Sequence, residues 1–167
     1  MKLSLLGGVE PADLTYNIAS GLLSGRVDQL TVRVQAGSGG RAGSKTPGAL
    51  NWWLANNPLA TRVKMADDKS RPGGPLPMGR YRVVPHESRS NWLRLLPESP
   101  ESMHGRTGMA IHGRGPRGSD GCIVPTDFTV VQQLYRVLVK RKAEQRPDAV
   151  LEVVAIGTDL DRQARTA

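Results

Sequence analysis

The sequence contains a single cysteine, so no disulfide can form within the chain. We therefore do not expect the fold to depend on an oxidising compartment. Aromatic residues are only 4% of the 167 residues, whereas 19 glycines and 12 prolines supply many turns. This composition favours short strands over long helices, in a chain long enough to bury a real core. We expect one domain over residues 1–167, with about 1–13 and 159–167 peripheral to it.

The sequence also lacks a long hydrophobic run. No stretch is long enough to cross a bilayer, so we expect no membrane span. The apolar run after Met1 is too short for the core of a signal peptide, so we expect no signal peptide.

Acidic residues are fewer than basic ones. The chain has 15 Asp and Glu against 23 Lys and Arg, which gives a formal charge of +8 at pH 7. Such an excess favours a polyanionic partner: nucleic acid, an anionic membrane or an acidic cell-wall polymer. No nucleic-acid motif and no interleaved surface aromatics are recognisable, so we do not expect a nucleic-acid partner.

The only cysteine lies in the most informative stretch, residues 108–124, with the sequence GMAIHGRGPRGSDGCIV. The apolar run before His112 predicts the end of a buried strand. Four glycines then follow before Cys122 and Ile123. Because glycine accepts positive φ without a steric penalty, the loop can fold back and bring Cys122 beside His112.

A thiol attacks carbonyls only as the thiolate, and a neighbouring imidazole can take its proton and hold the ion pair. We therefore predict that Cys122 is a nucleophile and His112 its base. The N–H groups of Gly121 and Cys122 are expected to bind the oxyanion that forms during the attack. The alternative is that Cys122 is a small buried hydrophobe without chemistry, which Ile123 and Val124 would suit.

Charged residues flank the predicted nucleophile. Arg114 and Arg117 would favour the thiolate and grip a substrate carboxylate. Asp120 would oppose the thiolate unless an arginine pairs with it. We assign Arg114, Arg117, Asp120 and Gly113 to substrate binding. No metal or organic cofactor is expected, because the spacing of the histidines and the cysteine matches no regular zinc pattern.

Two segments resemble the L,D-transpeptidase catalytic domain (YkuD-like) family. The family signature is a strand-borne His-Gly followed by Ser/Thr-His-Gly-Cys, and here IHG at 111–113 precedes SDGCI at 119–123. By position, Cys122 is the nucleophile, His112 the base and Ser119 the serine of the motif. Residues 74–83, GPLPMGRYRV, resemble the Gly-Pro-hydrophobic-Pro-x-Gly-x-Tyr segment of these domains.

The sequence departs from the family pattern at two positions. Asp120 replaces the usual second histidine, and Val124 replaces the usual basic or amide residue two places after the cysteine. The gap between base and nucleophile is also short, as in the type VI secretion L,D-transpeptidase effectors. These antibacterial toxins act on the peptidoglycan of rival cells.

The resemblance implies that Cys122 attacks the diaminopimelate carbonyl of a stem tetrapeptide and releases D-alanine. The acyl group then passes to a second stem, a free D-amino acid or water. The implied partners are peptidoglycan stem peptides, the secretion machinery and an immunity protein that covers the Cys122 cleft, with action in the target-cell periplasm. Two alternatives stay open: a housekeeping periplasmic L,D-transpeptidase, and a basic non-catalytic protein that binds cell wall or nucleic acid.

The expected fold is mainly β, a compact sandwich or barrel-like sheet with one substantial helix after Cys122, as the resemblance also implies. Helical spacing of apolar residues predicts that helix from Phe128 to about Lys142, capped by Thr126 or Asp127. Turn residues predict a break at 21–28 and loops at 36–48 and 97–106, and a helical turn is expected at 51–54. Strands are expected at residues 14–18, 30–35, 80–84, 92–96 and 150–156.

Overall fold

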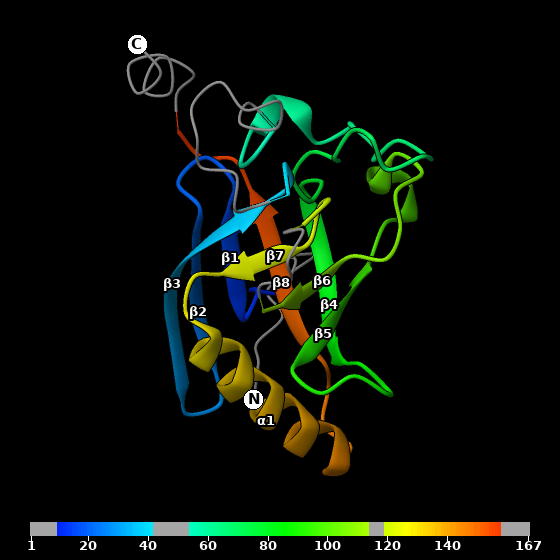
Figure 1. Ribbon diagram of the computed structural model, residues 1–167. Helices are drawn as coiled ribbons and strands as arrows, with labels where there is room; N and C mark the ends of the chain where they lie inside the picture. The colour runs from blue at the N-terminus through cyan, green and yellow to red at the C-terminus, as the bar shows by residue number, and fades with distance from the viewer. Residues whose placement is uncertain (1–9, 42–53, 114–118, 158–167) are drawn as a thin grey trace.

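The computed structural model describes residues 10–41, 54–113 and 119–157, which form a β-barrel with one α-helix (Figure 1). Helix α1 spans Phe128–Ala143. Two short 3-10 helices, η1 (Pro58–Ala60) and η2 (Pro100–Met103), lie in the connections. The strands are β1 (Leu14–Asn17), β2 (Leu22–Val27), β3 (Leu30–Ser38), β4 (Gly79–Pro85), β5 (Trp92–Pro97), β6 (Ala110–His112), β7 (Ile123–Pro125) and β8 (Ala149–Val154).

The barrel is closed in the order β1-β2-β3-β7-β6-β5-β4-β8, and β8 pairs with β1. Two neighbouring pairs, β1 with β8 and β6 with β7, are parallel, and the others are antiparallel. Closure leaves none of these strands with an unpaired edge. The fold class is therefore mainly β, as expected, and of the two expected forms the barrel is the one observed.

Alternating side chains of the strands fill the barrel, because successive residues of a strand point to opposite faces. Leu14 and Tyr16 of β1, Tyr81 of β4 and Leu151 of β8 are fully buried. Helix α1 covers one end of this core with Val131, Leu134 and Leu138, which are buried at helical spacing. It contacts β3 to β7, so its packing supports the two strands that carry the predicted site (Figure 1).

Five predicted strands and the helix are confirmed within two or three residues at each end. Asp127 is the N-cap of α1, and its carboxylate accepts a hydrogen bond from the Thr129 N–H at 2.9 Å. Among the described residues, no helix is long and apolar enough to cross a bilayer. The expected helical turn at 51–54 falls almost entirely outside the described residues.

The predicted break at 21–28 is wrong, because β2 occupies most of it. Gly25 lies inside β2 with φ of 140°, and a Cβ there would lie 2.1 Å from the Asp13 carbonyl oxygen. This glycine therefore permits a close approach of two chain segments instead of ending a strand. The strand β7 was also not expected, since three residues carry too little pattern to identify it.

Candidate active site

The parallel pairing of β6 with β7 brings the predicted nucleophile and base together. Ile111 of β6 is in register with Ile123 of β7, and both side chains are fully buried in the core. Their neighbours His112 and Cys122 therefore point away from the core. Both line one cavity of about 430 Å³, together with Ser119 and other residues of the surrounding loops.

The predicted base, His112, is held in one orientation. Nδ1 of His112 hydrogen-bonds the Gly113 carbonyl oxygen, which can only accept, so Nδ1 carries the proton of the neutral ring. Nε2 is then free to accept a proton. The ring also stacks on Trp92, with 4.2 Å between centroids and 4° between planes. Burial lowers the pKa of His112, so the imidazole is neutral near pH 7 and can act as a base.

The predicted nucleophile, Cys122, is a half-buried free thiol. Burial raises the pKa of Cys122, while a hydrogen bond from the Ala110 backbone lowers it. The thiol contacts the Gly108 carbonyl oxygen at 3.8 Å, and no hydrogen bond among the described residues joins it to His112. Burial thus favours a neutral thiol and imidazole over the expected ion pair, and proton transfer would accompany attack.

Ser119 shapes the turn that leads to Cys122. It is buried, its hydroxyl donates to the Cys122 carbonyl oxygen at 2.6 Å, and it accepts from the Gly121 N–H at 3.1 Å. In this conformation the Gly121 N–H is therefore engaged by Ser119, and it could bind an oxyanion only by leaving or sharing that hydrogen bond. Of the two N–H groups predicted to bind the oxyanion, those of Gly121 and Cys122, the Cys122 N–H is the one not used by Ser119.

Gly121 has no room for a side chain. Its φ is 144°, and a Cβ there would lie 2.5 Å from an Arg106 guanidinium nitrogen and 2.7 Å from the Met109 sulfur. This glycine therefore lets Arg106 and Met109 pack directly against the turn before the nucleophile.

Replacing Gly121 by alanine is expected to destabilise the fold by about 1–3 kcal/mol and to displace Cys122, because the new methyl group must push these neighbours away. Gly79→Ala is the matched control, since Gly79 has the same φ of 144° but its nearest neighbour is 3.4 Å away. Urea unfolding and the rate of Cys122 alkylation measure both effects. Equal changes in the two variants would contradict steric crowding at Gly121.

Asp120 pairs with an arginine that the sequence did not suggest. Its carboxylate lies 3.3 Å from the Arg41 Nε and accepts the Gly73 N–H at 3.2 Å. These contacts tie Asp120 to the neighbouring loops, although its charge still raises the pKa of Cys122. The predicted substrate-binding residues Arg114 and Arg117 lie outside the described residues.

Gly113 helps to orient the His112 ring. A Cβ at Gly113 would lie 2.5 Å from the ring of Phe128, the first residue of α1. Its carbonyl oxygen accepts the His112 hydrogen bond, so this glycine connects the base to the helix. The rest of the Phe128 side chain is open to solvent, since the residue is 46% exposed.

Sequence reasoning missed a buried arginine beside the nucleophile, because it placed Arg106 in a polar loop. Arg106 is only 4% exposed. Its guanidinium donates to four main-chain carbonyl oxygens at 2.6–2.8 Å, those of Thr61, Gly74, Pro75 and Asp120. Its charge lowers the pKa of Cys122 and so favours the thiolate. No local pattern around Arg106 signals this position.

The other two histidines lie outside this cavity. Nδ1 of His86 accepts the backbone N–H groups of Ser88 and Arg89, each at 3.1 Å, and His104 ends η2 in a left-handed conformation. Within the part of the chain that the structure describes, no group of three His, Cys, Asp or Glu side chains could hold a metal ion.

Comparison with known proteins does not assign this chain to a protein family. No family model, no curated protein and no solved structure matches it.

Proposed function

We propose that this protein is a peptidoglycan-modifying cysteine enzyme of the L,D-transpeptidase type, and that its barrel is the fold of that family. The observation that carries the proposal is the shared cavity of Cys122 and His112, in which a Gly113 hydrogen bond leaves Nε2 of the base free. A cysteine that only filled the core would not line a cavity beside an oriented imidazole.

In the proposed reaction, the Cys122 sulfur attacks the diaminopimelate carbonyl of a stem tetrapeptide while Nε2 of His112 takes the thiol proton. The tetrahedral intermediate collapses, the C–N bond breaks, and His112 returns the proton to the leaving D-alanine amine. An amine or water then attacks the thioester, His112 removes a proton from this acceptor, and the thiol is restored. The balance of acceptors decides between cross-linking, exchange and L,D-carboxypeptidase trimming.

The described cavity contains charges that suit a zwitterionic stem peptide. Lys64, which lines it, is exposed and can pair with a carboxylate. Asp67 lines the same cavity and can pair with the side-chain amine of diaminopimelate. Arg106 also lines it, but its guanidinium is occupied by carbonyl oxygens, so it acts on the thiolate and not as a substrate clamp.

The short interval between His112 and Cys122 supports an antibacterial effector delivered by a type VI system over a housekeeping transpeptidase. Its producer would then carry an immunity protein that covers the Cys122 cavity. Expression directed to the periplasm of a test bacterium is expected to be toxic, and cytoplasmic expression harmless. Equal growth in both cases would contradict the effector assignment.

Incubation of the protein with tetrapeptide-rich muropeptides tests the activity directly. The expected result is loss of D-alanine, or its exchange for an added D-amino acid, followed by mass spectrometry. An intact-mass adduct on Cys122 after carbapenem treatment would support the acyl-enzyme. Unchanged muropeptides under all conditions would reject the enzyme and leave the basic binding protein as the alternative.

A further inference from the structure

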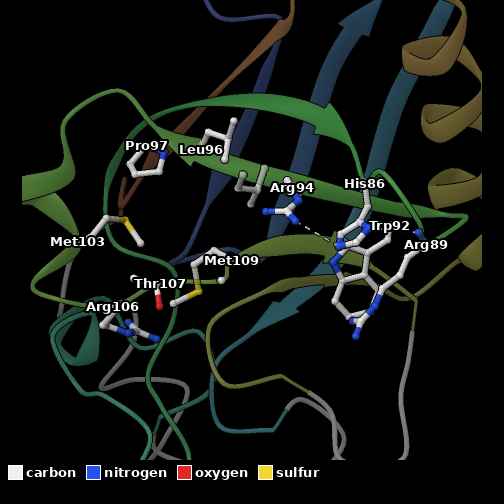
Figure 2. Close-up of a pocket in the computed structure, with 12 residues that line it drawn as sticks. His86, Arg89, Trp92, Arg94, Leu96, Pro97, Met103, Arg106, Thr107 and Met109 are labelled. Carbon is white, nitrogen blue, oxygen red and sulfur yellow. Dashed lines mark hydrogen bonds between the residues drawn. The ribbon is translucent and has the colours of Figure 1, made fainter. Parts of the chain in front are cut away.

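Three side chains form a continuous stack that ends on the base. The Arg89 guanidinium carbon lies 4.8 Å from the centroid of the Trp92 ring, and that ring lies parallel to the His112 ring. Trp92 and His112 are register partners across β5 and β6. Arg89 comes from the turn between β4 and β5, and it lies beside Trp92 at the edge of a second hollow (Figure 2).

We propose that Trp92 and Arg89 are positioning residues for His112: Trp92 fixes the plane of the imidazole, and Arg89 disfavours a second positive charge beneath that stack. The inference rests on the proposed function, in which His112 is the base for Cys122. It adds two residues to the site that contact neither the sulfur nor the cavity around it.

The role of Trp92 in orienting the imidazole follows from two contacts of the His112 ring. The Gly113 carbonyl oxygen fixes Nδ1 at the edge of the imidazole, and Trp92 covers one of its faces. Together they limit rotation about the side-chain bonds of His112 and keep Nε2 directed toward one region of the cavity. A base held in this way loses less entropy when it engages the thiol.

Arg89 can oppose protonation of His112 because its positive charge has no carboxylate partner among the described residues. Its neighbour Arg94 is paired with Glu87, with an Nε–carboxylate distance of 2.9 Å. Arg94 also lies 3.5 Å from the His86 ring nitrogen, a contact drawn as a dashed line in Figure 2. Arg89 instead contacts the face of Trp92, an interaction that favours a cation. Its charge adds to burial in lowering the pKa of His112.

Other charged groups also face His112, and the test must separate them from Arg89. On the side of the nucleophile the cavity carries charged or titratable groups from three segments, namely Lys64, Asp67, Arg106, Asp120 and Cys122. The second hollow behind the 106–109 segment carries His86, Arg89 and Arg94. Only Arg89 among them stacks on the ring that covers His112.

NMR titration of the His112 imidazole, combined with the pH profile of kcat/KM, tests the proposal. Arg89→Gln is expected to raise the His112 pKa, since the positive charge on the far side of Trp92, which adds to burial in lowering it, is removed. The sign follows because the protonated imidazole is no longer repelled, so the acid limb of the profile moves to higher pH by the same amount. Arg89→Lys keeps the positive charge, so the His112 pKa of this variant should stay close to the wild-type value.

Trp92→Leu is expected to lower kcat about tenfold or more with a smaller change in KM, because Nε2 loses its fixed direction. Trp92→Phe keeps an aromatic face and should recover most of the loss. Arg82→Gln is the matched control for charge, since Arg82 is an exposed arginine of β4 paired with Asp148 at 3.0 Å. It should change neither the titration nor the rate.

The titration needs no substrate, so the inference and the proposed function can fail separately. An unchanged His112 pKa in Arg89→Gln would overturn the role of Arg89, and an unchanged kcat in Trp92→Leu would overturn the role of Trp92, even in an active enzyme. Absence of D-alanine release by the wild type would refute the proposed function. The titration would still show whether the stack controls the ionisation of His112.

Discussion

Cys122→Ala is expected to abolish D-alanine release from tetrapeptide muropeptides, and His112→Ala to reduce it by about 10⁴-fold. The alanine variant has no sulfur to form the thioester. Without His112, the thiol keeps its proton, because burial raises the Cys122 pKa and the thiol's hydrogen-bond partner among the described residues is a main-chain carbonyl oxygen, that of Gly108, which cannot take the proton. Mass-spectrometric rates of D-alanine release measure both losses.

The controls for this prediction are the two histidines outside the cavity. His86→Ala and His104→Ala are expected to change the rate by only a few-fold, since neither side chain lines the cavity of Cys122. Cys122→Ser tests the nucleophile further, because a hydroxyl has a much higher pKa than a thiol and should fail with the same base. Retained activity in both Cys122→Ala and His112→Ala would reject the site assignment.

Arg106→Leu is expected to lower the free energy of unfolding by about 3–5 kcal/mol, the largest stability effect we predict. The guanidinium is 4% exposed and satisfies four carbonyl oxygens. Leucine would leave these acceptors in a low-dielectric environment without donors. Arg106→Lys should recover only part of the loss, because an ammonium has three donors and lacks the planar fork.

Urea unfolding of Arg106→Leu beside Arg82→Leu measures this effect. Arg82 makes an exposed ion pair with Asp148, and its loss should cost under about 1 kcal/mol. Equal destabilisation of the two variants would contradict a structural function for the buried guanidinium. In Arg106→Lys, the charge near the sulfur is retained, so the pH dependence of Cys122 alkylation should change little. In Arg106→Leu that charge is lost, so the Cys122 pKa should rise and alkylation of Cys122 near neutral pH should slow.

Much of the fold could be predicted because its signals are local. Alternating apolar residues marked β1 and β4, and helical spacing with a capping aspartate marked α1. The break predicted near Gly25 failed because a glycine signals a turn and a close backbone approach equally well. The length of β3 was underestimated because its last three residues, Ala36, Gly37 and Ser38, are small and resemble a loop.

The sequence by itself determined which two side chains, Cys122 and His112, are proposed as the reactive pair. Cys122 and His112 are connected by a short glycine-rich loop, so covalent proximity restricts how far apart they can lie, and their chemistry is intrinsic to the side chains. Only the tertiary structure decided what surrounds them. Arg106, Trp92 and Arg41 reach the site from segments outside that loop, through strand pairing and loop packing that no local pattern encodes. Burial, which sets the protonation states of thiol and imidazole, likewise exists only once the barrel has closed.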